Sequence, residues 1–167
     1  MLRLRANDIY GGVVGTVLAS VIVAAMPLGE NPSQAALWVC VSIAITAITR
    51  SYGQHVSTHS ADSEAGFWTD LGRNMLTGIP LVIACLPTIL ILLFAHVLDW
   101  HDDIVHPDGS VTVGYTTVIL VVNMVLLFGW GLLAARAGGY SAWKAAAIGL
   151  GNTALGLAVF VVNSLNQ

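Results

Sequence analysis

Long stretches without a charged residue divide this chain, and they restrict its fold more than any other feature. They cover residues 9–29, 31–49, 74–98, 109–135 and 145–167. Each reaches or exceeds the roughly 18 apolar residues that indicate a membrane-spanning helix. Because lipid offers the backbone no hydrogen-bond partner, a spanning segment has to bond internally, as a helix does. The sequence therefore predicts an all-α integral membrane protein with five transmembrane helices.

The overall composition agrees with this class. Apolar residues make up 56% of the chain and charged residues only 9%, whereas a soluble domain has about 25% charged residues. No linker or repeat divides the 167 residues, so we expect a single membrane domain over 1–167 with the lipid bilayer as its surroundings. After removal of turn-like ends, the expected spans are about 9–28, 33–50, 75–98, 114–135 and 143–164.

The basic residues predict the orientation. In a five-span arrangement all of them fall on the same side of the membrane; they are Arg3, Arg5, Arg50, Arg73, Arg136 and Lys144. Cytoplasmic loops are enriched in Lys and Arg, so the N-terminus is expected in the cytoplasm and the C-terminus outside. The absence of a targeting signal favours a multi-pass protein of the cell membrane.

Two connecting segments have their own expected structure. The sequence of residues 51–73 predicts that the second helix continues and is followed by a turn and then by an interfacial helix around SEAGFWTDLGRNM. On the outer side, DIVHPDGSVTV resembles a β-hairpin, because HPDG has Pro at the second turn position and Gly at the last. The outer segment also contains several His and Asp residues, which are expected to form a solvated acidic loop rather than a metal site.

Polar residues at the end of the second span form two stripes on a helix. The first consists of Thr46, Arg50, Gln54 and Ser57, and the second of His55, His59 and Asp62. Two His one turn apart with a nearby carboxylate can hold a divalent cation. The simpler alternative is that the helix has left the lipid at Arg50, beyond which polar residues need no ligand.

Other functional classes receive little support. Cys40 and Cys85 lie within apolar stretches without CxxC-like spacing, so they are expected to be small packing residues. No basic patch favours nucleic-acid binding, and no catalytic motif favours an enzyme. Small residues in the first and last spans form faces suited to close helix packing or to a dimer. Gly149 and Gly156 share one such face of the last span, and Ala147 and Gly151 share another.

Three segments resemble the vacuolar iron transporter family. They are IYGGVVGT (9–16), YGQHVSTHS (52–60) and the last two spans with their short basic turn, LLFGWGLLAARAGGYSAWKAAAIGLGNTALGLAVFVVNSL (126–165). The resemblance implies five helices, homodimer formation, and export of ferrous and related ions from the cytosol. It also implies a pathway between the first two helices, past Gly11, Gly12, Arg50, Gln54 and His55.

The chain departs from the family at the positions that bind the ion. The family's helix 1 aspartate falls on Gly11, its helix 2 glutamate on Gln54 and its pore methionine on Arg50. The segment after the second span is also too short for the family's Glu-rich cytoplasmic metal-binding domain.

The first hypothesis is therefore a transporter of altered selectivity, which moves a divalent metal ion or another small solute out of the cytosol. The alternative is a non-transporting structural or accessory subunit of another membrane protein. No resident cofactor is assigned; a divalent metal ion enters only as a candidate substrate, which His55, His59 and Asp62 would bind at the inner mouth.

Overall fold

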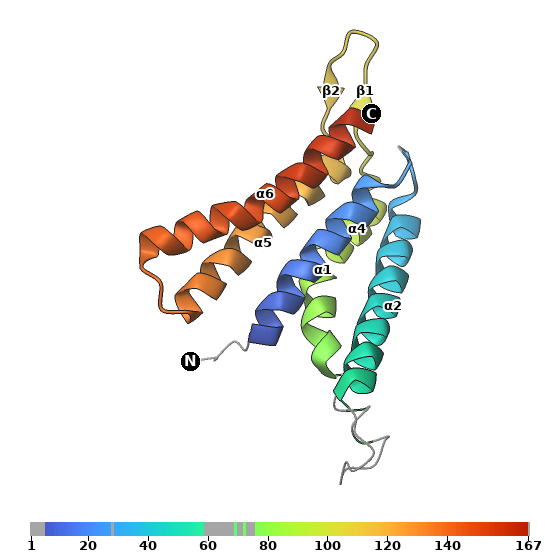
Figure 1. Ribbon diagram of the computed structural model, residues 1–167. Helices are drawn as coiled ribbons and strands as arrows, with labels where there is room; N and C mark the ends of the chain where they lie inside the picture. The colour runs from blue at the N-terminus through green and yellow to red at the C-terminus, as the bar shows by residue number, and fades with distance from the viewer. Residues whose placement is uncertain (1–5, 28, 59–68, 70–71, 73–75, 167) are drawn as a thin grey trace.

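Helices that alternate in direction account for most of the chain (Figure 1). The computed structural model describes residues 6–27, 29–58, 69, 72 and 76–166. The helices are α1 (Ala6–Ala24), α2 (Pro32–Thr58), the short 3₁₀ helix η1 (Leu76–Gly78), α4 (Ile79–Val97), α5 (Tyr115–Ala137) and α6 (Ala142–Asn166). The all-α prediction is therefore confirmed, apart from one small two-stranded sheet.

Four of these helices are long and apolar enough to cross a membrane, as a multi-pass membrane protein requires. Within the residues that the structure describes, the four are α2, α5, α6 and the continuous segment made of η1 and α4. The apolar part of α1, Asp8–Ala24, is shorter than the other four.

The first helix ends earlier than the sequence predicts, and the second extends beyond the membrane stretch as predicted. The expected first span reaches residue 28, but α1 ends at Ala24 because Pro27 and Gly29 form the turn that follows; Gly29 has a φ of 80°, which favours glycine. The side chain of Asn31 then caps α2 by accepting a hydrogen bond from the Ser33 backbone. Because α2 continues to Thr58, the predicted extension of this helix beyond the membrane stretch is confirmed. The predicted interfacial helix lies largely outside the described residues.

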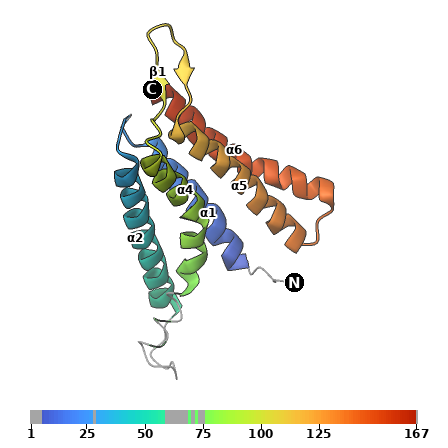
Figure 2. The ribbon, with the colours of Figure 1, turned by 180° about the vertical axis from the view of Figure 1, so that it is seen from behind.

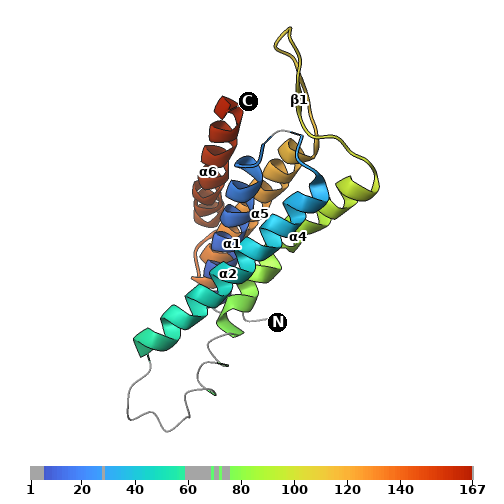
Figure 3. The same ribbon diagram turned by 90° about the vertical axis from the view of Figure 1, so that its right-hand side faces the viewer.

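Helix α1 occupies the centre of the bundle and contacts all the other long helices (Figure 3). Two of its glycines allow α4 to approach closely. A Cβ at Gly15 would lie 2.4 Å from the carbonyl oxygen of Leu81, and one at Gly11 would lie 2.9 Å from the Cβ of Pro80. Cys85 fills the same contact, with its sulfur 3.1 Å from the Gly15 carbonyl oxygen, so its predicted role as a packing residue is confirmed.

Helices α5 and α6 form the most extensive helix pair (Figure 2). Gly149 lies against the ring and backbone of Phe128, and Gly156 lies against Met124. The Gly149 and Gly156 face predicted from the sequence is therefore a packing face within one chain. The second small-residue face of this helix, with Ala147 and Gly151, is exposed.

A β-hairpin lies between α4 and α5, as the sequence predicts. Strands β1 (Ile104–Val105) and β2 (Val111–Thr112) pair antiparallel, with Val105 opposite Val111. The backbone N–H of Gly109 donates to the His106 carbonyl at 2.9 Å, which closes the turn, and Gly109 itself has a φ of 80°. A turn followed by a left-handed glycine is a common three-residue hairpin loop.

Two acidic side chains join this hairpin to the helix ends beside it. Asp103 is only 4% exposed; it accepts hydrogen bonds from the backbone of Gly114, which precedes α5, and from the Thr117 hydroxyl. Asp102 accepts a hydrogen bond from the backbone of Gly29 at 3.2 Å, which connects the loop after α1 to the loop after α4. Asp103 therefore ties the start of α5 to the segment that leads into the hairpin.

Charge is distributed unequally between the two ends of the bundle. Where α2 and α5 end and α6 begins, the described residues include Arg50, Arg136 and Lys144; we call this the basic end. The opposite end, called the hairpin end, includes Glu30, Asp99, Asp102, Asp103 and Asp108.

Candidate functional site

Polar side chains from three elements meet at the basic end, where α1 begins, α2 ends and η1 leads into α4. The guanidinium carbon of Arg50 on α2 lies 4.5 Å from the ring centroid of Tyr10 on α1. One turn further along α2, Gln54 accepts a hydrogen bond of 2.6 Å from the Thr77 hydroxyl of η1. Arg50 and Gln54 thus link α2 to two different neighbours, and both belong to the predicted pathway.

His55 lies on the buried side of α2. Its side chain is 1% exposed, as is that of Ser51 one turn before it. Helix η1 covers this side of α2, because a Cβ at Gly78 would lie 3.1 Å from the Cβ of Ala47 and 3.3 Å from the Ser51 hydroxyl. The simpler expectation, that the helix has left the lipid at Arg50 and that polar residues beyond it need no ligand, stays a prediction.

The two predicted pathway glycines are packing positions. Gly11 faces Pro80 and Leu81 of α4, and Gly12 faces the ring of Trp130 on α5, which a Cβ would approach to 2.5 Å. Arg50, Gln54 and His55 thus lie within two turns of α2, whereas Gly11 and Gly12 point at α4 and α5.

The charge and shape of Arg50 bear on which solutes this end of the bundle would attract or repel. A planar guanidinium over an aromatic ring is a cation–π contact, which keeps the positive charge in place. Two unit charges about 4 Å apart interact by ~4 kcal/mol at an effective dielectric constant near 20. Taken by itself, the charge of Arg50 would repel a divalent cation placed beside it and attract an anion.

The predicted metal ligands can be compared with the structure only in part. His59 and Asp62 lie outside the described residues, so their grouping with His55 stays a prediction. In the part of the chain that the structure describes, no group of three His, Cys, Asp or Glu side chains is placed to hold a metal ion. In the outer segment, Asp102 and Asp103 bind backbone groups instead, and His106 contacts the Thr112 hydroxyl at 2.8 Å.

A second polar group, which sequence reasoning missed, lies inside the bundle. The side-chain amide nitrogen of Asn123 on α5 lies 3.0 Å from the hydroxyls of both Ser20 on α1 and Thr88 on α4. None of the three side chains is more than 1% exposed. Polar side chains commonly hydrogen-bond across membrane helices, and a lone Asn within an uncharged stretch is the available sequence signal. We call these residues the interior triad.

Comparison of the chain with family models, with curated proteins and with solved structures gave no match. The likeness to vacuolar iron transporters therefore rests on the three sequence segments, and a functional assignment rests on this chain's own geometry.

Proposed function

We propose that this chain is a membrane transporter that moves a small solute out of the cytosol, and that Arg50 sets its selectivity. The observation that carries the proposal is the stacking of Arg50 on Tyr10, which fixes a positive charge where α1 and α2 meet. The family resemblance assigns a soft metal ligand to that position. Replacement of that ligand by a guanidinium supports a transporter whose preference has moved away from divalent metals.

The proposed topology has five spans, with the basic end in the cytosol and the C-terminus outside. Helix α1 has 19 residues, and at 1.5 Å per residue it extends ~28 Å, close to the roughly 30 Å of the hydrocarbon core. The charge difference between the two ends supports the orientation. The cell membrane is the proposed location.

Flux through liposomes that contain the purified protein tests the selectivity. The substitution Arg50→Met removes the charge and restores a thioether, so uptake of Fe²⁺, Mn²⁺ or Zn²⁺ should increase over that of the unmodified protein. Arg136→Met removes the same charge from an exposed position at the same end and should leave the flux unchanged. Equal flux through all three proteins would place Arg50 outside the pathway.

A second candidate function, that of a non-transporting structural or accessory subunit, has an observation in its favour. Pro80, Leu81 and Trp130 occupy the space beside Gly11 and Gly12, where the resemblance places part of a pathway. A protein that carries no solute in liposomes and copurifies with another membrane protein would favour this function.

Homodimer formation, which the resemblance implies, is also proposed. The small residues of α1 pack inside one chain, since Gly11, Gly12 and Gly15 all contact neighbouring helices. The exposed α6 face with Ala147 and Gly151 is therefore the better candidate surface. Gly151→Leu should weaken a cross-linked dimer, whereas Gly129→Leu, at a glycine that also has no close neighbour, should not.

A further inference from the structure

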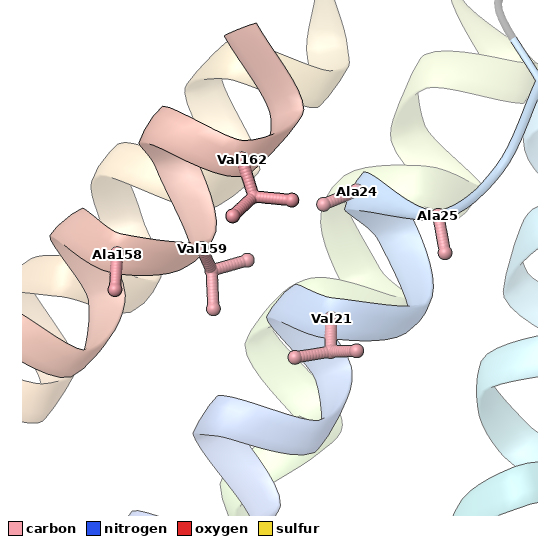
Figure 4. A pocket seen from close by; sticks show the side chains of 6 residues that line it. All are labelled: Val21, Ala24, Ala25, Ala158, Val159 and Val162. Carbon is pink, nitrogen blue, oxygen red and sulfur yellow. The ribbon is translucent and has the colours of Figure 1, made fainter. Parts of the chain in front are cut away.

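Two apolar grooves lie on either side of the last turns of α1. The first, between α1 and α6, has a volume of about 290 Å³ and is lined by Val21, Ala24, Ala25, Ala158, Val159 and Val162 (Figure 4). The second, between α1 and α2, has a volume of about 330 Å³ and includes Trp38 and Glu30 in its lining. Val21 and Ala25 line both grooves, so the two grooves adjoin and the end of α1 separates them.

Helix length and side-chain size explain the grooves. Helix α1 ends at Ala24, while α6 continues to Asn166 at the same end of the bundle. The side chains that face each other across the first groove are Ala or Val, which leave the space between α1 and α6 unfilled (Figure 4). A short helix beside longer ones thus produces a notch at the hairpin end.

The chemistry of the lining identifies the occupant. All six side chains of the first groove are hydrocarbon, and an apolar hollow offers water no hydrogen-bond partners. A helix with its side chains is ~10 Å across, so a partner helix would cover a groove of about 290 Å³ without filling it. A flexible acyl chain can follow the groove, and its methylene groups match the hydrocarbon lining.

The charges at this end indicate the headgroup. Glu30 lies at the rim of the second groove, and the described Lys and Arg side chains lie at the basic end. An anionic headgroup would meet a carboxylate there, whereas an ammonium group would be attracted to it. We propose that the hairpin end binds one two-chain phospholipid, with its acyl chains on either side of α1 and its ammonium group facing Glu30. This site does not depend on the proposed transport.

Native mass spectrometry of the full chain, purified in detergent and titrated with phosphatidylethanolamine, tests the site. Val162→Phe places a larger side chain in the first groove, and Val161→Phe makes the same change at a neighbouring exposed position outside both grooves. We expect the unmodified protein and Val161→Phe to retain a bound lipid, and Val162→Phe to lose it. In parallel titrations with phosphatidylglycerol, Glu30→Gln should reduce the preference for phosphatidylethanolamine.

Three outcomes would overturn the proposal. In the first, the unmodified protein retains no lipid. In the second, the two Phe variants retain lipid equally, which would indicate general coverage by lipid rather than a site. In the third, Val162→Phe but not Val161→Phe abolishes a dimer, which would mean that a second copy occupies the groove.

Discussion

Thr88 on α4 and Asn123 on α5 are hydrogen-bonded to each other inside the bundle, with the two oxygens 3.1 Å apart. Asn123 also bonds to Ser20, so this contact connects α1 and α4 to the α5–α6 pair. At this depth lipid cannot replace a lost partner. The interior triad is therefore expected to hold α5 in its position against α1 and α4.

A double-mutant cycle measures this coupling. Asn123→Leu and Thr88→Val should together destabilise the protein less than the sum of the two single changes, because each alone already breaks the bond. The coupling should be about 0.6 kcal/mol, with an upper value of about 1.7 kcal/mol for such bonds in membranes, as measured by unfolding in mixed detergent micelles. Thr153→Val is the control for Thr88→Val, since the Thr153 hydroxyl bonds within its own helix. Strictly additive effects for Thr88 and Asn123 would exclude their hydrogen bond as a connection between α4 and α5.

Two glycine substitutions should change stability in opposite directions. Gly15→Ala brings a methyl group against the backbone of Leu81, which cannot rotate away, and overpacking of this kind costs about 1–3 kcal/mol. Gly53→Ala meets no atom within 4 Å and should stabilise α2 by about 0.5–1 kcal/mol, because alanine is the better helix former. Thermal unfolding in detergent compares the two variants. A neutral Gly15→Ala would contradict the close contact between α1 and α4.

The hairpin turn should respond to acid through Asp108. Hydrogen bonds from the Ser110 side chain and then its backbone hold the pKa of Asp108 below its usual value. Because the pKa is lower in the folded turn, the stabilisation is present above the usual pKa and is lost as the pH falls through the lowered one. A carboxyl chemical-shift titration by NMR should show this, and Ser110→Ala should move the pKa upwards. A pKa that does not respond to Ser110→Ala would exclude the side-chain bond as the cause.

Features with a local cause were predictable from the sequence. HPDG predicts the hairpin because the preferences of Pro and Gly act within one turn, and the uncharged stretches predict the helices because each must satisfy its own backbone. The end of α1 was misjudged by four residues, since lack of charge does not mark where a helix ends before Pro27.

Features that depend on distant partners were not predictable. The glycines of α1 were interpreted as a pathway or a dimer face, and the sequence did not indicate that Gly12 faces Trp130, which is far away in the sequence. Asn123 and Ser20 are 103 residues apart, and no periodicity connects them. His55 was placed on a polar stripe, but the periodicity did not indicate that η1 packs on that side of α2. In each case the sequence indicates a residue suited to close contact without indicating its neighbour.

The central claim is that five helices cross the membrane with the basic end in the cytosol. Reporter tags on the two chain ends, one active only in the cytosol and the other only outside it, test this in intact cells. We expect a cytosolic N-terminus and an external C-terminus. Both ends in the same compartment would contradict the five-span arrangement and, with it, the proposed pathway past Arg50.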